Sequence, residues 1–179
     1  EKQMFHHPSL KGVICNSNMV KNDIVSRFHL ADEQVHVIHN GVDTTKFNLS
    51  LQESYRTPFR TTQGLNETHT VILYVGSGYS RKGVPQLLEA FAQTYRPNDV
   101  LWIVGKDKQQ KRMEALAMRL GIANSVRFFG AQENVLPFYG AADYFALPTL
   151  YDPFPNVVLE ALASGLPSLV SETCGAAEV

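Results

Sequence analysis

The sequence predicts an α/β fold in which a doubly wound parallel sheet carries helices on both faces. Two observations support this prediction. Wholly apolar runs of strand length, such as 71–75 and 100–104, are typical of strands buried on both faces, because a parallel sheet is covered by helices on each side. Segments with helical spacing of apolar residues alternate with these runs over short links, a pattern typical of sheets that bind ligands at the carboxyl ends of their strands.

The region before those runs predicts two strands, a helix and a linker. Residues 12–15 predict a short strand that ends in a polar turn, and residues 19–28 predict a helix whose apolar residues can share one face. Residues 35–39 form a β-branched run that predicts a second strand. The stretch 43–69 is polar with few periodic apolar positions, so we expect an interdomain linker there.

The remaining elements follow in alternation. The predicted strands are 71–75, 100–104, 126–129, 144–147 and 166–170, and the predicted helices are 85–95, 108–120, 135–140 and 156–164. Pro85 can occupy the first turn of its helix, and Gly121 ends the next one. Pro153 and Pro155 forbid a helix across their turn, so the last helix is expected to begin near Asn156.

Length, charge and cysteine content narrow the class of protein. The 179 residues are 44% hydrophobic, which is enough for one sizeable core. The net charge is −1, so no broad basic field attracts nucleic acid or anionic lipid. Two distant cysteines fit a reducing compartment, and no apolar run approaches the roughly 18 to 20 residues that span a bilayer. We expect a cytoplasmic protein whose chain is cut at both ends.

Two segments combine charged side chains with the start of a helix. The helix that begins near Asn156 leaves its first amides free, and the positive end of its dipole attracts phosphate. Glu160, about one turn into this helix, can direct its carboxylate toward ribose hydroxyls, and Asp152 stands eight positions earlier. In the second segment, 76–83, small residues between a buried strand and a helix let phosphates approach the backbone.

These segments resemble the retaining glycosyltransferases of the GT-B fold, which carry a Glu-x7-Glu signature where this chain reads Asp152-x7-Glu160. The resemblance covers nearly the whole chain through the ordered motifs Cys15-Asn16-Ser17, His39-Asn40-Gly41-Val42-Asp43, Tyr74-Val75-Gly76-Ser77-Gly78, Arg81-Lys82-Gly83, Val104-Gly105 and Arg127-Phe128-Phe129-Gly130. Within the family, the glycine loop and the segment 152–156 look most like the lipopolysaccharide core glucosyltransferases that use UDP-glucose.

The resemblance implies a parent protein with two Rossmann-like domains. Residues 1–45 would be the end of the N-terminal domain and the start of the linker, residues 46–69 the interdomain linker, and residues 70–179 the C-terminal nucleotide-sugar-binding domain. The donor site would then lie in this chain, and the acceptor would contact the N-terminal domain. The parent would work in the cytoplasm or at the cytoplasmic face of the inner membrane.

The resemblance also implies catalytic roles for Arg81, Lys82 and Asp152. A leaving nucleoside diphosphate gains negative charge as the glycosidic bond breaks, so Arg81 and Lys82 would stabilise the transition state without a metal. The alternative is a plain connection between strand and helix, with Arg81 and Lys82 as a solvated pair. The common family pattern has an Arg where this chain has Ser77, and we expect Arg81 to supply that guanidinium from the other side of the loop. Asp152 would balance positive charge on the anomeric carbon, with capping of the coming helix as the alternative.

The expected binding residues surround these three. They are Gly76, Ser77, Gly78, Gly130, Ala131, Phe154, Pro155, Asn156, Val157 and Glu160. The resemblance places the nucleobase over Gly130 and Ala131. Glu160 lies among apolar residues, where an unpaired carboxylate is costly unless a ligand or a donor meets it, and an ordinary surface position is the alternative. The six histidines lack metal-ligand spacing, so we expect no metal and no cofactor beside the UDP-sugar donor.

The resulting expectation is a glycosyltransferase that moves a hexose, glucose first among them, from a UDP-sugar to a glycan or lipopolysaccharide-type acceptor with retention of configuration. A sugar-nucleotide epimerase of the same architecture and a non-catalytic nucleotide-binding module are the alternatives. Product analysis separates the two enzymes, because an epimerase alters the donor sugar whereas a transferase needs an acceptor.

Overall fold

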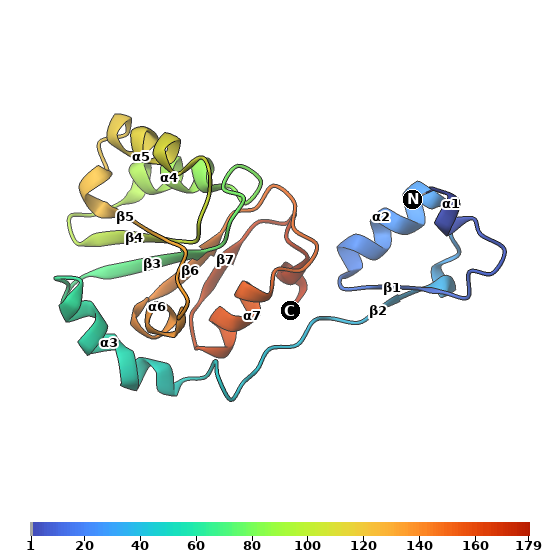
Figure 1. Cartoon of the computed structure of the whole chain (residues 1–179), viewed down its shortest axis with the longest axis horizontal. Coiled ribbons are helices and arrows are strands. Elements are labelled where there is room, and N and C mark those ends of the chain that lie inside the picture. The colour runs from blue at the N-terminus through green and yellow to red at the C-terminus, as the bar shows by residue number, and fades with distance from the viewer. Residues whose placement is uncertain (1) are drawn as a thin grey trace.

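The protein, described over residues 2–179 by a computed structural model, has a smaller N-terminal part and a larger C-terminal part (Figure 1). The smaller part comprises α1 (Lys2–Phe5), β1 (Val13–Cys15), α2 (Asn18–Phe28), the 3-10 helix η1 (Asp32–Gln34) and β2 (Val35–Val37). Strands β1 and β2 pair in parallel, and α2 packs against them. The two strands and the helix predicted for this region are therefore confirmed.

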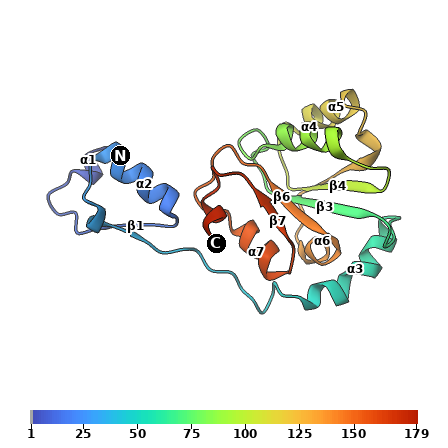
Figure 2. The same ribbon diagram turned by 180° about the vertical axis from the view of Figure 1, so that it is seen from behind.

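The larger part is a five-stranded parallel sheet covered on both faces by helices. Its elements are α3 (Ser50–Thr62), β3 (Thr70–Val75), α4 (Val84–Thr94), β4 (Asp99–Val104), α5 (Gln110–Arg119), η2 (Ala123–Ser125), β5 (Val126–Gly130), α6 (Leu136–Ala141), β6 (Tyr144–Leu147), α7 (Asn156–Ala163), β7 (Ser168–Val170) and η3 (Gly175–Glu178). The strand order is β5-β4-β3-β6-β7. Helices α4 and α5 cover one face, and α3, α6 and α7 cover the other (Figures 1 and 2). The predicted doubly wound α/β fold is confirmed.

The core lies at the centre of this sheet, where β3 and β4 pair along their whole length. Leu73 and Trp102 are fully buried in these strands, because helices shield both faces of the sheet from water. Helix α4 adds Leu88 and Phe91 from its inner face. The wholly apolar runs in the sequence therefore correspond to the central strands, and their carboxyl ends form one edge of the sheet.

Helix α3 lies in the segment where the sequence predicts a polar linker, and this helix is not predicted from the sequence. Its Arg60 is only 1% exposed. The guanidinium donates to the Ala141 carbonyl through Nε (2.8 Å) and to Asp143 Oδ2 through Nη2 (2.6 Å). A buried cation is tolerated because these acceptors satisfy it. Because an arginine normally indicates a surface position, the polar sequence of this segment does not predict a helix with a buried face. The domain boundaries stay a prediction.

Helices α3 and α6 approach each other closely at Gly140. A Cβ placed on Gly140 would lie 2.3 Å from the carbonyl oxygen of Leu51 and 3.0 Å from Tyr55 Cβ. Contacts this short force the backbone of one helix to move. Only glycine therefore allows α6 to pack on α3 at this distance.

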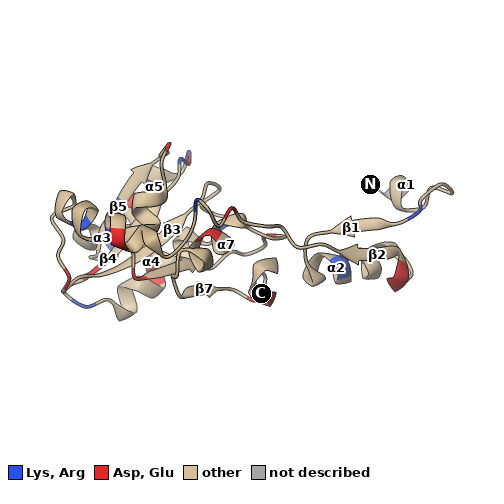
Figure 3. Cartoon of the chain, turned by 90° about the horizontal axis from the view of Figure 1, so that it is seen from below, with Lys and Arg blue, Asp and Glu red and all other residues tan. Residues whose placement is uncertain are grey.

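The surface carries charges of both signs. Figure 3 marks Lys and Arg positions and Asp and Glu positions on both parts of the ribbon, and the two kinds nearly balance to a net charge of −1. Among residues 2–179, no helix combines the length and the apolar character that crossing a bilayer requires. The cytoplasmic location stays a prediction.

We predict that Gly140→Ala lowers the free energy of unfolding by about 1 to 3 kcal/mol, because the added methyl group pushes α3 and α6 apart. Urea unfolding followed by circular dichroism measures the change. Gly41→Ala is the matched control, since a Cβ at Gly41 would have no heavy atom within 4 Å, and we expect a change within about 0.5 kcal/mol. An equal loss of stability in both variants would contradict this description of the contact.

Candidate functional site

The loops after β3 and β6 are joined at the carboxyl edge of the sheet. The Leu150 amide donates to the Arg81 carbonyl (2.8 Å), and the Thr149 hydroxyl donates to the same oxygen (3.2 Å). A Cβ on Gly83, whose φ is +75°, would lie 1.8 Å from the Pro148 carbonyl oxygen. The two loops therefore fit together only because position 83 is glycine. This junction brings two expected site segments, 76–83 and 152–160, side by side.

The Asp152 carboxylate lies between the two expected catalytic cations. Its Oδ2 is 3.4 Å from Arg81 Nη1 and 3.4 Å from Lys82 Nζ. Asp152 is 7% exposed as a residue, and the Lys82 side chain is 14% exposed, whereas half of the Arg81 side chain meets solvent. A carboxylate buried to this extent needs such partners. The sequence-predicted trio is thus assembled into one cluster with two positive charges and one negative charge.

The backbone of Asp152 is fixed by the segment that leads into η3. Its amide donates to the Thr173 carbonyl (3.2 Å), and its carbonyl accepts from the Gly175 amide (2.9 Å). The side chain makes no hydrogen bond to α7, whose N-cap position is Pro155. Asp152 therefore does not cap the helix. Its carboxylate instead forms ion pairs with Arg81 and Lys82.

The glycine loop serves the cluster by making room for Lys82. A Cβ on Gly76 would lie 3.0 Å from Lys82 Cδ and 3.4 Å from the Tyr74 hydroxyl oxygen, so a side chain there would displace the lysine. The Gly76 amide donates to the Val104 carbonyl (2.8 Å), and the Gly78 amide donates to Asp107 Oδ2 (2.7 Å). Both amides are therefore engaged within the chain. The expected approach of phosphate to Gly76, Ser77 and Gly78 stays a prediction.

Asp107, which follows β4, braces the glycine loop. One carboxylate oxygen accepts from the amides of Gly78 (2.7 Å) and Tyr79 (3.0 Å), and the other accepts from the Gln109 amide (2.7 Å). The hydrogen bonds from Gln109, Tyr79 and Gly78 hold the pKa of Asp107 below its ordinary value. Sequence reasoning missed this role, because a charged loop between a strand and a helix is usually solvated.

The first turn of α7 leaves two amides without a protein acceptor. Helix α7 begins at Asn156, as predicted, and its N-cap residue Pro155 offers no side-chain hydrogen bond. Within residues 2–179, the amides of Asn156 and Val157 make no hydrogen bond, whereas the Val158 amide reaches the Pro155 carbonyl (3.1 Å). Two free amides at the positive end of a helix are suited to an anion.

The segment that follows β2 contacts this turn directly. The Asn40 side-chain amide donates to Asn156 Oδ1 (2.8 Å) and to the Phe154 carbonyl (3.3 Å). The ring of His39 stacks on the buried ring of Phe154, with centroids 5.1 Å apart. His39 and Asn40, just after β2, are therefore placed beside the first turn of α7.

Glu160 is half-buried and is held by a tyrosine. The Tyr139 hydroxyl donates to Glu160 Oε2 (2.8 Å), and Tyr139 itself is fully buried in α6. Glu160 is therefore not an ordinary surface residue. Sequence reasoning missed Tyr139, because a tyrosine inside a short apolar helix gives no sign of its partner on α7.

Gly130 and Ala131 are not bonded to the charged cluster. Gly130 ends β5, and its carbonyl accepts from the Gly105 amide (2.7 Å) at the same carboxyl edge. No hydrogen bond or ion pair within residues 2–179 joins Gly130 or Ala131 to the charged cluster. Phe129 is partly buried and packs edge-on against Trp102 of the core. The nucleobase contact at 130–131 stays a prediction.

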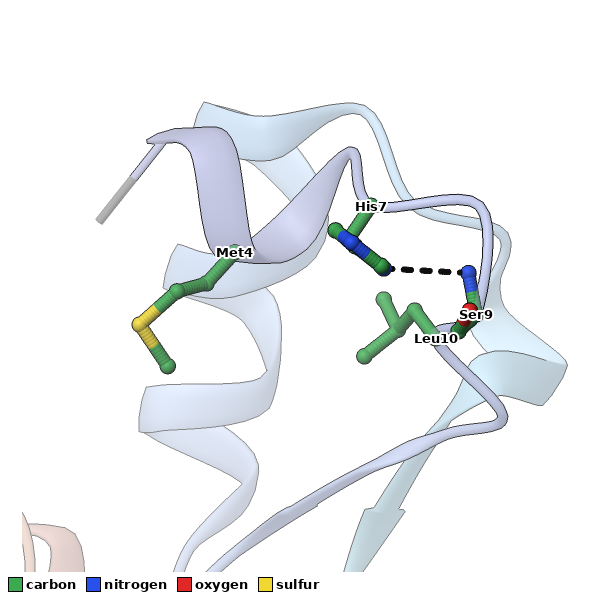
Figure 4. A pocket seen from close by; sticks show the side chains of 4 residues that line it. All are labelled: Met4, His7, Ser9 and Leu10. Carbon is green, nitrogen blue, oxygen red and sulfur yellow. Dashed lines mark hydrogen bonds between the residues drawn. The ribbon is translucent and has the colours of Figure 1, made fainter.

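A separate hollow lies in the smaller part, near α1 (Figure 4). Met4, His7, Ser9 and Leu10 line it, and the Ser9 amide donates to His7 Nδ1 (3.2 Å). None of these four residues is a lysine, an arginine, an aspartate or a glutamate. The charged cluster at the sheet edge is therefore the stronger candidate site.

Comparison with known proteins defines the family. Residues 56–179 match the profile of the glycosyl transferases group 1, and residues 1–46 match that of Glycosyltransferase Family 4. The chain belongs to the glycosyl transferases group 1 family. It is 32% identical over 170 residues to an uncharacterized glycosyltransferase of Methanocaldococcus jannaschii, and 33% identical over 157 residues to the lipopolysaccharide glucosyltransferase WaaG of Escherichia coli. The matches cover 93% and 86% of this chain but 44% and 41% of those relatives, so the chain spans less than half of their length.

Solved structures show the same architecture. The crystal structure of WaaG matches with a TM-score of 0.85 at 30% identity, over 97% of this chain and 47% of that one. The structure of Anabaena HepE in complex with UDP-glucose matches with a TM-score of 0.82 at 27% identity, over 94% and 46%. The resemblance to GT-B glycosyltransferases inferred from the sequence is therefore confirmed.

We predict that Asp107→Ala lowers the free energy of unfolding at pH 7 by about 1 to 2 kcal/mol, as the loss of a side chain that caps free amides does elsewhere. The pKa of Asp107 in the folded chain lies below the ordinary 3.8, so its contribution is complete above that value and is lost as pH falls through the folded pKa. Urea unfolding at pH 7 and at pH 3 measures the deficit, which we expect to shrink at pH 3. Glu172→Ala, at an exposed position, is the control. A deficit independent of pH would contradict this role.

Proposed function

We propose that this chain carries the donor site of a retaining glycosyltransferase and binds UDP-glucose or a related UDP-hexose. The observation that carries the proposal is the cluster in which Arg81 and Lys82 both lie 3.4 Å from Oδ2 of the Asp152 carboxylate. The cluster keeps one unbalanced positive charge beside the first turn of α7. A diphosphate supplies negative charge to the cations and acceptors to the free amides of that turn.

In the proposed reaction, the two cations receive the diphosphate as its bond to the sugar breaks. Lys82 is largely buried and lies over Gly76, so it needs little reorganisation to stabilise the negative charge that develops. The exposed Arg81 side chain can reorient toward the ligand. Asp152 faces the same space and would balance positive charge on the anomeric carbon. Retention of configuration and independence of a metal are parts of this proposal.

Two of the comparisons support the choice of nucleotide and sugar. The HepE structure is a complex with UDP-glucose, and WaaG is named as a lipopolysaccharide glucosyltransferase. This chain resembles both over most of its length. We therefore propose that the protein is a glucosyltransferase and not an epimerase of the donor sugar, because these named relatives are glycosyltransferases.

We further propose that the acceptor is a glycan or lipopolysaccharide-type molecule held mainly by the N-terminal domain of the parent protein. This chain spans less than half of the length of these curated relatives, and the segment after β2 contacts the first turn of α7 through His39 and Asn40. The chain alone would then bind a UDP-sugar with little turnover. Work at the cytoplasmic face of the inner membrane is part of the same proposal.

We predict that isothermal titration calorimetry detects binding of UDP and UDP-glucose to this chain at millimolar concentration or below. Arg81→Ala and Lys82→Ala should each weaken UDP binding by about tenfold to a hundredfold, because a charge-assisted hydrogen bond contributes about 1.5 to 3 kcal/mol. Neither change should alter the affinity for uridine, which lacks the diphosphate.

Lys108→Ala is the matched control, since Lys108 is an exposed lysine in the neighbouring loop after β4. Its affinity for UDP should equal that of the unchanged chain. Absence of heat with UDP at millimolar concentration would contradict the donor-site assignment, and so would an equal loss in the Lys82 and Lys108 variants.

A further inference from the structure

Tyr139 lies on α6 in a fixed position between aromatic rings. Phe47 meets its ring edge-on with centroids 5.5 Å apart, and Phe145 stacks on it at 6.3 Å. The residue is fully buried, and its neighbour Gly140 seats α6 against α3. A ring packed on these sides cannot swing away. The position of the hydroxyl is therefore determined by the core.

The Tyr139 hydroxyl has one strong partner. It donates to Glu160 Oε2 at 2.8 Å and approaches the Val157 carbonyl oxygen at 3.4 Å. Phenylalanine would satisfy the aromatic packing, whereas a buried hydroxyl costs free energy unless it is hydrogen-bonded. Burial and the nearby Glu160 charge raise the pKa of Tyr139 well above its ordinary value, so the phenol keeps its proton and remains a donor.

The hydrogen bond restricts the Glu160 side chain. A half-buried glutamate otherwise samples several rotamers, each with the carboxylate in a different place. Oε2 is committed to Tyr139, whereas Oε1 makes no hydrogen bond to any of residues 2–179. The core thus holds one end of the carboxylate and leaves the other end available to a donor from outside the chain.

We propose that Tyr139 is a positioning residue that orients the Glu160 carboxylate for the hydroxyls of a ribose, and that the pair makes the site selective for ribonucleotides. This inference rests on the proposed function. It adds a residue that touches no substrate and acts through Glu160. A ribose offers two adjacent hydroxyl donors on one face, which suits a carboxylate that is already fixed at one oxygen.

The selectivity has a physical reason. A ligand without these hydroxyls leaves Oε1 of the half-buried Glu160 unpaired, so the pair would discriminate against deoxyribose. A carboxylate free to rotate could withdraw into water instead, and the discrimination would be small. Fixing the carboxylate therefore sharpens the preference for ribose, and does not merely strengthen binding.

The experiment compares UDP with 2′,3′-dideoxy-UDP in calorimetric titrations of the unchanged chain, Tyr139→Phe, Glu160→Gln and Tyr55→Phe. Tyr55 is the matched control, because it lies on α3 at the α3–α6 contact and its hydroxyl makes no hydrogen bond within residues 2–179. The unchanged chain and Tyr55→Phe should bind UDP about tenfold to a hundredfold more tightly than the dideoxy analogue. Tyr139→Phe and Glu160→Gln should reduce that ratio to about threefold or less, with an affinity for the dideoxy analogue that is not lowered, because a carboxylate free to turn into water no longer penalises that ligand.

Thermal melts of the same variants separate positioning from folding. A Tyr139→Phe chain that melts lower but keeps the full ratio would overturn the inference while leaving the proposed function intact. A Tyr139→Phe chain that loses affinity equally for both nucleotides would also overturn it, since the loss would then be structural. Failure of the unchanged chain to bind UDP would overturn the proposed function, and the inference with it.

Discussion

A buried carboxylate between two cations holds the candidate site together. Asp152 is removed from water, and a charge in that position is stable only when it is paired, here with Arg81 and Lys82. The pairing fastens the loop after β3 to the loop after β6, and backbone hydrogen bonds between them reinforce it. Gly76 and Gly83 make the fit possible, because a side chain at either position would meet the lysine or the Pro148 carbonyl. The charges and the glycines therefore form one unit, and the free amides of α7 lie next to it.

The second half of the site depends on helix packing farther from the surface. Helix α3 contacts α6 at Gly140, α6 places Tyr139 in the aromatic core, and Tyr139 holds Glu160 on α7. Each step is a close contact between elements that are distant in sequence. Glu160 thus owes its orientation to α6, a helix that carries none of the expected binding residues.

The sequence was informative where the signal is local. Apolar runs identified the central strands, and Pro153 with Pro155 located the start of α7 at Asn156. It was uninformative where a residue's meaning depends on a distant partner. Arg60, Asp107 and Tyr139 bind partners 83, 29 and 21 residues away, respectively. An isolated Arg or Asp normally indicates a solvated position, and a tyrosine in an apolar helix indicates core. The buried role of Arg60, the brace at Asp107 and the support of Glu160 could be seen only once the elements were folded together.

A crystal structure of this chain soaked with UDP tests the central claim most directly. We expect the diphosphate within hydrogen-bond distance of the Arg81 and Lys82 side chains, its oxygens facing the first amides of α7, and the ribose hydroxyls on Glu160. A nucleotide bound elsewhere, for instance in the hollow beside α1, would contradict the claim. So would a soaked crystal in which the cations remain closed on Asp152 and the first turn of α7 stays empty at saturating nucleotide.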